Sequence, residues 1–321
     1  MLGFVETAPW QWAGFILCLL IFIGIDMGAF SRRPRLVTYR EALLWSLVWF
    51  TLAMLFAWLM VYLRGPDHAT EFVTGYLIEL SLSLDNILII AIIFTTFRVP
   101  VEFQRRVLVL GIIGALLMRG VMIGVGAVLV QKFAWVLYVF GVFLFFTGAR
   151  MLFGRHESVN PERFLVTRIF RRFFPVSPDF DGQKLVTRSN GLRMLTPLAL
   201  VLLIVETSDL LFAVDSVPAV FSVTRSAFVV FTSNMFAILG LRSLYFLLSD
   251  AIGRFRHLKT GLSLVLVFIG VKMLLDPHDR PPRWFQVEIP TTVSLLVVVA
   301  VLTTAMVLSV IGSRRHDKVG P

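Results

Sequence analysis

Two long apolar stretches of the chain contain acidic residues that could bind a cation inside a membrane. Glu79 and Asp85 lie in GYLIELSLSLDNILIIAIIF, and Glu206, Asp209 and Asp215 lie in LALVLLIVETSDLLFAVDSVPAVF. An ionised carboxylate at the centre of a bilayer costs roughly 2.5–3.5 kcal/mol. A metal ion, an arginine or a proton must therefore neutralise these side chains, and the identity of that partner decides their chemistry.

The remaining polar groups of these stretches are mostly oxygen donors. Asn86 is a sixth candidate ligand, and the hydroxyls of Ser83, Thr207 and Ser216 are supporting groups. All five histidines lie outside the apolar stretches, and Cys18 is the only cysteine. A site built from oxygen suits Mg²⁺, Ca²⁺ or Mn²⁺ rather than Zn²⁺ or Cu⁺. The residue types predict a site for a hard divalent cation without distinguishing among the three.

Two arginines inside apolar stretches offer a competing explanation. Arg119 lies in ALLMRGVM and Arg242 in ILGLRSLY, so each follows an acidic stretch by one span. Salt bridges to these arginines could neutralise acids purely for structural reasons, but two arginines leave about three of five carboxylates unbalanced. Protonation or a divalent cation must supply the rest, and we favour the cation site over a purely structural network.

Helical spacing separates the acids of the first stretch. Residues four and seven apart lie near whole turns, so Glu79, Ser83 and Asn86 share one helix face. Asp85 is rotated by about 120° from Glu79.

The second stretch has the same difficulty, and a proline offers a remedy. Glu206 and Asp209 are neighbours on a helix, whereas Asp215 points away from Glu206. Pro218 has no N–H group, so the carbonyl of Val214 loses its helical donor. We predict a helix interrupted here, which would expose Asp215 and free carbonyl oxygens to the site.

The composition predicts an all-α fold, a polytopic membrane helix bundle. Of the 321 residues, 57% are hydrophobic and 16% are charged, against about 25% charged residues in soluble domains. Hydropathy predicts nine transmembrane helices. They cover residues 10–30, 42–63, 72–97, 107–130, 133–153, 194–222, 226–249, 259–275 and 291–312.

The basic residues follow the topology of these spans. Arginines concentrate in loops 31–41, 98–106, 154–193 and 250–258 and in the C-terminal tail, which the positive-inside rule places in the cytoplasm. The expected location is the cell inner (plasma) membrane, multi-pass, with the N-terminus outside and the C-terminus inside. The net charge of +10 therefore reflects topology, and no nucleic-acid partner is expected.

The two acidic spans open similar blocks of three spans. Six residues separate Glu79 from Asp85 and Asp209 from Asp215, and the third spans read GVFLFFTGARMLF and LSLVLVFIGVKML. Three is odd, so the second block crosses the membrane inverted, as in many secondary transporters.

This repeat divides the chain into five predicted parts. Residues 1–71 hold two N-terminal helices, with Asp26 as an interfacial or functional acid near the cytoplasmic end of the first. The first and second repeats are 72–153 and 194–275, joined by a basic cytoplasmic loop, 154–193. Its RIFRRFF segment could lie on anionic headgroups or belong to an ordinary linker. Residues 276–321 hold an outer loop, the last span and a tail.

At these residues the chain resembles the TerC family of integral membrane proteins, which includes the alkali-inducible Alx group. The matching stretches are EFVTGYLIELSLSLDN, VLGIIGALLMRG, VETSDLLFAVDSVPAVFSVT and TSNMFAILGLRSLYF. The resemblance implies Mn²⁺ export, with links to tellurium resistance and alkaline pH. It also implies a set of cation-binding residues, carried over by position: Glu79, Asp85, Asn86, Glu206, Asp209 and Asp215.

We therefore predict a secondary transporter that moves Mn²⁺ outward in exchange for protons. The chain has no GxxxxGK[ST] loop to hold ATP, and no prosthetic group is expected. The alternative is a membrane metal or pH sensor, or a partner of other membrane proteins in a stress-response or insertion complex. Asp85 and Asp215 could in principle form a hydrolase dyad, but their sequence contexts do not favour it, and we expect no enzyme. A homo-oligomer is compatible with the sequence.

Overall fold

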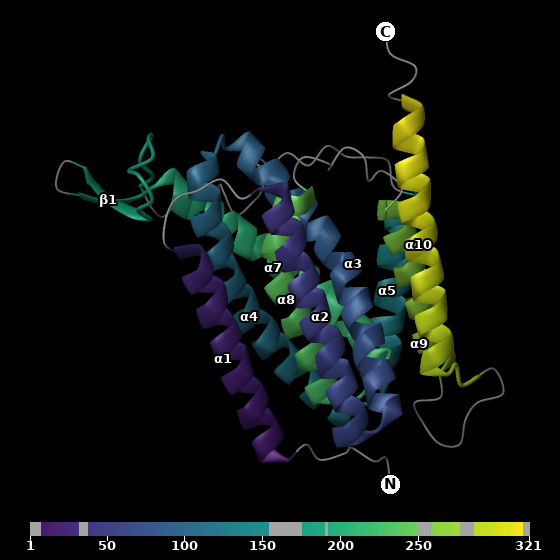
Figure 1. The fold of residues 1–321 in the computed structure, drawn as a ribbon. Coiled ribbons are helices and arrows are strands. Elements are labelled where there is room, and N and C mark those ends of the chain that lie inside the picture. The colour runs from purple at the N-terminus through teal and green to yellow at the C-terminus, as the bar shows by residue number, and fades with distance from the viewer. Residues whose placement is uncertain are drawn as a thin grey trace.

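A computed structural model describes residues 8–31, 38–153, 175–189, 192–248, 258–276 and 286–316. These residues form a bundle of long helices with a small hairpin at one end (Figure 1). The helices are α1 (Pro9–Ser31), α2 (Tyr39–Arg64), α3 (Pro66–Thr96), α4 (Val101–Lys132), α5 (Trp135–Phe153), α7 (Pro197–Phe221), α8 (Ala227–Leu248), α9 (Leu258–Leu275) and α10 (Thr291–His316). Each of the nine predicted spans lies on one of these helices, which confirms the all-α membrane fold.

Most of these helices are long and apolar enough to cross a bilayer. Within the described residues, α2, α3, α4, α5, α7, α8 and the Thr291–Ser309 part of α10 meet this criterion, and α1 has a shorter apolar segment, Pro9–Ile25. Large apolar side chains such as Trp58, Leu117 and Phe146 are exposed on the outside of the bundle. Lipid tails can cover such side chains at no cost, which explains why the bundle leaves them outside.

The helices α3 and α4 begin about six residues earlier than hydropathy predicts. Gly65, with a φ of 95°, separates α2 from α3, and Pro66 takes the first position of α3, where a missing N–H costs nothing. The first turn of α3 contains Asp67. Hydropathy detects only the apolar part of a helix, so polar first turns were missed.

The helix α7 is not interrupted at Pro218, which corrects the prediction of a break. It runs unbroken from Pro197 to Phe221, and Pro218 lies in its last turn. A proline there removes one hydrogen bond shortly before the helix ends, and the buried side chains of Val217 and Val220 hold the turn in place.

An antiparallel hairpin, β1 (Val186–Ser189) and β2 (Leu192–Leu195), precedes α7, so the helix of the sixth predicted span begins at Pro197 rather than at residue 194. Val186 pairs with Leu195 and Ser189 with Leu192. The sequence between the strands is Asn-Gly, the dipeptide most typical of a two-residue hairpin, and the sequence reasoning overlooked it. The RIFRRFF segment lies outside the described residues.

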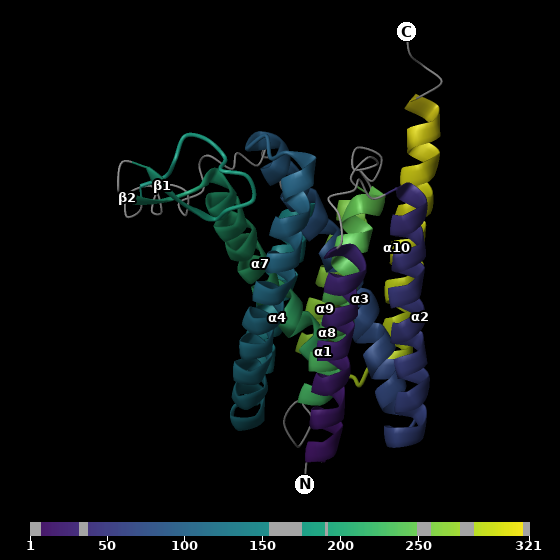
Figure 2. The same cartoon turned by 60° about the vertical axis from the view of Figure 1, so that its left-hand side comes forward.

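The central helices come from both predicted repeats. α3 packs against α7 and α8, α4 packs against α7 and α8, and α5 packs along α9. Figure 2 shows α4 and α7 side by side, with α1 and α2 on the outside of α8. Each of these central pairs joins one helix of the first block to one of the second.

The helices α5 and α9 meet through reciprocal glycine contacts. A Cβ on Gly148 would lie 2.8 Å from the amide nitrogen of Val267, three residues before Gly270. A Cβ on Gly270 would lie 2.5 Å from the amide nitrogen of Phe145, three residues before Gly148. The two helices therefore run antiparallel, with the same contact made in both directions, as two-fold symmetry requires. This reciprocity supports the inverted repeat, which remains a prediction.

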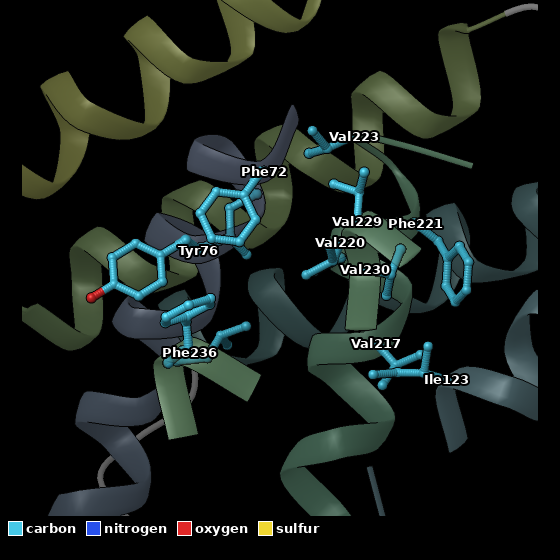
Figure 3. Packing of buried hydrophobic residues seen from close by; sticks show 14 of the residues in the cluster. Phe72, Tyr76, Ile123, Val217, Val220, Phe221, Val223, Val229, Val230 and Phe236 are labelled. Carbon is cyan, nitrogen blue, oxygen red and sulfur yellow. The ribbon is translucent and has the colours of Figure 1, made fainter. Parts of the chain in front are cut away.

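Two hydrophobic clusters enclose the middle of the bundle. One joins Phe72 and Tyr76 of α3 to Phe236 of α8 and Phe221 of α7 (Figure 3). The other includes Ile87, Ile90, Ile93 and Phe94 of α3, Leu198, Leu200, Val201, Ile204 and Val205 of α7, and Tyr245 of α8. On α7 the polar residues from Glu206 to Ser216 lie between Val205 of the second cluster and Val217 of the first. On α3 Glu79 and Ser83 alternate with Ile78 and Leu82 of the first cluster.

Candidate functional site

The buried face of α3 carries the three residues that the helical spacing placed together. The exposed fraction is 0% for Glu79, 0% for Ser83 and 2% for Asn86. Asp85 lies off this face and is only partly buried, as its rotation predicts. The local arrangement of α3 was thus predictable from the sequence.

Arg119 of α4 is the centre of the polar network. Its side chain is fully buried, and its guanidinium contacts the carboxylate of Glu79. Nη2 donates to Oδ1 of Asp209 at 3.1 Å, and Nε donates to Oδ2 at 3.4 Å. Nη1 donates to Ser216 Oγ at 3.2 Å and to Asn234 Oδ1 at 3.1 Å. One arginine therefore joins side chains from α3, α7 and α8.

Asp209 is the acid with the most donors. In addition to the two bonds from Arg119, its Oδ1 accepts a hydrogen bond from Asn86 Nδ2 at 3.2 Å. Asn86 and Asp209 belong to different predicted repeats, so this bond joins the two acidic motifs at one site. The buried arginine contacts both Asp209 and Glu79, so one positive charge faces two carboxylates.

Glu206 lies one turn away from Asp209 and is placed differently. Its carboxylate lies against the backbone of α4 at Gly114, where a Cβ would come within 2.1 Å of Oε1. Its Oε2 is buried without a hydrogen-bond partner. The nearby charge of Asp209 is negative and therefore repels it. Within the described chain, no ion pair neutralises Glu206.

Unpartnered oxygens are concentrated on these faces of α3 and α7. Buried oxygens without a hydrogen-bond partner among the described residues are Oε2 of Glu79, Oγ of Ser83, Oδ1 of Asn86 and Oε2 of Glu206. Buried polar atoms in folded proteins nearly always have a partner. The three carboxylate and amide oxygens are acceptors only, and the Ser83 hydroxyl can accept as well as donate, so a donor or a cation would satisfy all four.

The two remaining acids are directed to other helices. Asp215 accepts a hydrogen bond from Thr147 of α5, and the charge of Lys259 of α9 acts on Asp85. Glu206 and Asp215 thus contact different helices, α4 and α5. The helical spacing predicts this, because it places the two side chains on opposite faces of α7. Over the described ranges, no group of three or more acids, histidines or cysteines is gathered tightly enough to hold a metal ion. The six-residue ligand set therefore remains a prediction.

The supporting residues are only partly in the network. Ser216 belongs to it, whereas Thr207 donates to the carbonyl of Leu203 on its own helix. Arg242 is buried on α8, 3% exposed. Asp26 lies on α1, and its side chain is outside the described residues.

Two residues of the site were not predicted. Asn234 could have been noticed because it is an amide within an apolar span, flanked by the buried hydroxyls of Thr232 and Ser233. Gly114 could not, because its neighbour Glu206 is distant in sequence.

Comparison with known proteins agrees with this architecture. The family model described as "Integral membrane protein TerC family" matches residues 64–317. An uncharacterized membrane protein of Myxococcus xanthus, STKORF319, is 45% identical over 96% of this chain and 94% of its own length. Alx of Escherichia coli (strain K12), provisionally named a membrane-bound redox modulator, is 42% identical over 97% of both chains.

A membrane protein of Rickettsia bellii, also uncharacterized, is 36% identical over 96% of this chain and 99% of its own length. No solved structure matches the chain significantly. The family match and these relatives extend over nearly all of the sequence, so the chain belongs to the TerC family of integral membrane proteins.

Proposed function

We propose that this protein is a secondary transporter that exports Mn²⁺ from the cytoplasm in exchange for protons. The observation that carries the proposal is the set of buried, unpartnered oxygens on Glu79, Ser83, Asn86 and Glu206. These oxygens lie in the membrane interior, and no described arginine or lysine pairs with the Glu206 carboxylate. A cation would give the oxygens a partner and would supply the counter-charge that Glu206 lacks.

The donor chemistry favours a hard divalent ion. Carboxylate, amide and hydroxyl oxygens are the ligands that Mn²⁺, Mg²⁺ and Ca²⁺ accept. The resemblance to the TerC family, which implies Mn²⁺ export, favours Mn²⁺ among them. An acidic site would repel tellurium oxyanions, so we treat tellurium resistance as indirect.

The two hydrophobic clusters supply the gates that such a transporter needs. On α7 one cluster lies before Glu206 and the other after Ser216, so apolar side chains flank the polar residues of this helix in both directions. Opening the cluster around Ile90 and Tyr245 would admit a cation from one side, and opening that around Phe72 and Phe221 would release it to the other. Alternating opening of this kind is the usual mechanism of transporters with inverted repeats.

Arg119 acts as an internal counter-cation in this scheme. Its positive charge faces Glu79 and Asp209 when no cargo is bound, which lowers the cost of carboxylates in the membrane. An arriving divalent cation competes with the guanidinium for the same oxygens. Protons arriving from outside then replace the cation on the carboxylates.

The proposed orientation places the hairpin end of the bundle in the cytoplasm of a cell with an inner (plasma) membrane. In Figure 1, α1 begins at the end of the bundle opposite to the hairpin and to the end of α10. The hairpin strands carry Arg188 and Arg193, in keeping with the positive-inside rule. Partners beyond Mn²⁺, protons and lipid would be further copies of this chain or other membrane proteins.

Flux in proteoliposomes tests this function. Purified wild type and the variants Asp209→Asn, Asp85→Asn and Asp215→Asn are reconstituted with an interior Mn²⁺-sensitive dye and a pH dye. We expect saturable Mn²⁺ uptake with proton counter-flow in the wild type and its loss in the variants. Glu102→Gln, which alters an exposed acid at the start of α4, is the matched control and should transport normally.

The Arg119 network also favours a second function. If Arg119 stays paired permanently, the acids that it contacts serve only to hold the helices together. The protein would then be a non-transporting sensor or a partner of other membrane proteins. Folded wild type that moves no Mn²⁺, Mg²⁺ or Ca²⁺ would support this reading and exclude the transporter.

A further inference from the structure

The position of Gly114 in α4 is unusual because of what a side chain there would touch. A Cβ would lie 2.1 Å from Oε1, 2.3 Å from Cδ and 2.3 Å from Oε2 of Glu206. The missing side chain therefore leaves the space in which the whole carboxylate lies. A glycine inside a helix costs about 1 kcal/mol relative to alanine, so its presence needs a reason.

Other glycines of the same helix do not have this role. A Cβ on Gly111 would make an ordinary contact of 3.6 Å with Val205, and one on Gly124 would meet nothing within 4 Å. A Cβ on Gly126 would come within 3.0 Å of the Phe221 ring, an apolar packing contact. Among these glycines of α4, Gly114 is the one whose missing side chain leaves room for a carboxylate.

The arginine of the site is fully engaged elsewhere. The contacts of Arg119 go to Glu79, Asp209, Ser216 and Asn234, and none of those described goes to Glu206. The Glu206 carboxylate thus has the backbone of α4 on one side and the like charge of Asp209 nearby. Its ionised form needs a cation that the described chain does not supply.

We propose that Gly114 is a positioning residue for cation binding: it leaves the space for the Glu206 carboxylate, an acid beside Asp209 that Arg119 does not contact. This inference rests on the proposed function. It adds to that function a residue that fixes where the Glu206 carboxylate meets the cation.

The substitution Gly114→Ala separates this role from a structural one. The new methyl group would meet the far end of a flexible side chain, which can swing away without moving any backbone. The protein should therefore fold with an unchanged or higher melting temperature, since alanine is the better helix former. The displaced carboxylate would no longer meet the cation, and misplacement of a ligand by about 1 Å can cost on the order of a hundredfold.

The experiment compares the KM for Mn²⁺ in proteoliposomes with the melting temperature in detergent. We expect Gly114→Ala to raise KM at least about tenfold while Gly124→Ala, the control on the same helix, leaves it at the wild-type value. The double variant Gly114→Ala/Glu206→Asp should recover part of the affinity, because the shorter acid leaves room for the methyl group.

Three results would overturn the inference while leaving Mn²⁺ transport intact. These are a wild-type KM in Gly114→Ala, an equal rise in Gly124→Ala, and a loss in Gly114→Ala that comes with a lower melting temperature and no recovery in the double variant. A wild-type protein without Mn²⁺ flux would instead contradict the proposed function, and the inference with it.

Discussion

Arg119 and Asp209 form a two-pronged ion pair that links the predicted repeats inside the membrane. Nε and Nη2 of the arginine on α4 reach the two carboxylate oxygens of the aspartate on α7, at 3.4 and 3.1 Å. The planar guanidinium matches a carboxylate in this way, whereas lysine is a point charge. The same guanidinium contacts Glu79 of α3, so one cation holds the acids of both motifs.

Removing this cation should destabilise the protein strongly. Arg119→Met leaves Glu79 and Asp209 buried without a counter-charge, and breaking a buried ion pair from one side costs about 3–5 kcal/mol. We expect a lower melting temperature in detergent, partly restored by Mn²⁺ if the metal takes the place of the guanidinium. Arg119→Lys, which keeps the charge and loses the fork, should lose less.

The control for this prediction is Arg98→Met, since Arg98 is an exposed arginine beyond the end of α3. Equal melting temperatures for Arg119→Met and Arg98→Met would show that the network contributes nothing to stability.

The close approach of α5 and α9 gives a second prediction. A Cβ on Gly270 would lie 2.5 Å from the amide nitrogen of Phe145 and 2.9 Å from the carbonyl oxygen of Gly141. Backbone atoms cannot move aside as side chains do, so Gly270→Ala should lower stability by about 1–3 kcal/mol or more. Gly148→Ala should do the same from the opposite side. Gly124→Ala, in open space, serves as the control in a thermal unfolding assay, and a matching loss there would contradict the account.

Much of the architecture could be predicted because membrane burial constrains sequence strongly. Apolar length predicted the helices, and helical spacing predicted that Glu79, Ser83 and Asn86 share a face while Asp85 does not. Both the apolar length of a span and the helical spacing of its residues are local features of the sequence. They can therefore be recognised in a single chain.

The details of the site depend on packing between helices, which a single sequence does not contain. Nothing in the spacing indicates that Arg119 lies opposite Asp209 or that Gly114 accommodates Glu206. The effect of Pro218 was misjudged because a proline in a last turn and a proline in mid-helix look alike in sequence. Only the helix end at Phe221 distinguishes them.

Because α7 is unbroken, we predict that Pro218 is not needed for cation binding. Pro218→Ala restores an N–H donor for the Val214 carbonyl, and the last turn should stay helical. We expect a change in stability within about 1 kcal/mol and a wild-type KM for Mn²⁺ in flux assays. A severe loss of Mn²⁺ affinity in a stably folded Pro218→Ala protein would mean that the free carbonyl is a ligand after all.

The hairpin before α7 should respond to acid in a defined direction. Hydrogen bonds from Thr187 and Lys184 hold the pKa of the exposed Asp181 below its ordinary value of 3.8. A depressed carboxylate pKa gives a stabilising contribution that is present above the ordinary value and is lost as pH falls through the folded-state pKa. Protection of the hairpin amides should therefore be constant near neutral pH and fall only in strong acid.

Hydrogen–deuterium exchange of residues 181–196 measures this protection. Asp181→Asn should speed exchange already at pH 7, because the ion pair with Lys184 is gone and the amide accepts the Thr187 bond more weakly. Asp179→Asn, a change at an exposed neighbour, is the matched control. Unchanged exchange in Asp181→Asn would show that this carboxylate does not hold the hairpin.

The central claim is that the buried oxygens of α3 and α7 bind a divalent cation, and direct Mn²⁺ binding tests it most simply. Electron paramagnetic resonance reports free Mn²⁺ by its six-line signal, which weakens when the ion binds protein. We predict saturable binding in detergent-solubilised wild type and in Glu102→Gln, and its loss in Glu206→Gln. Binding that is absent from the wild type, or equally strong in Glu206→Gln, would contradict the account.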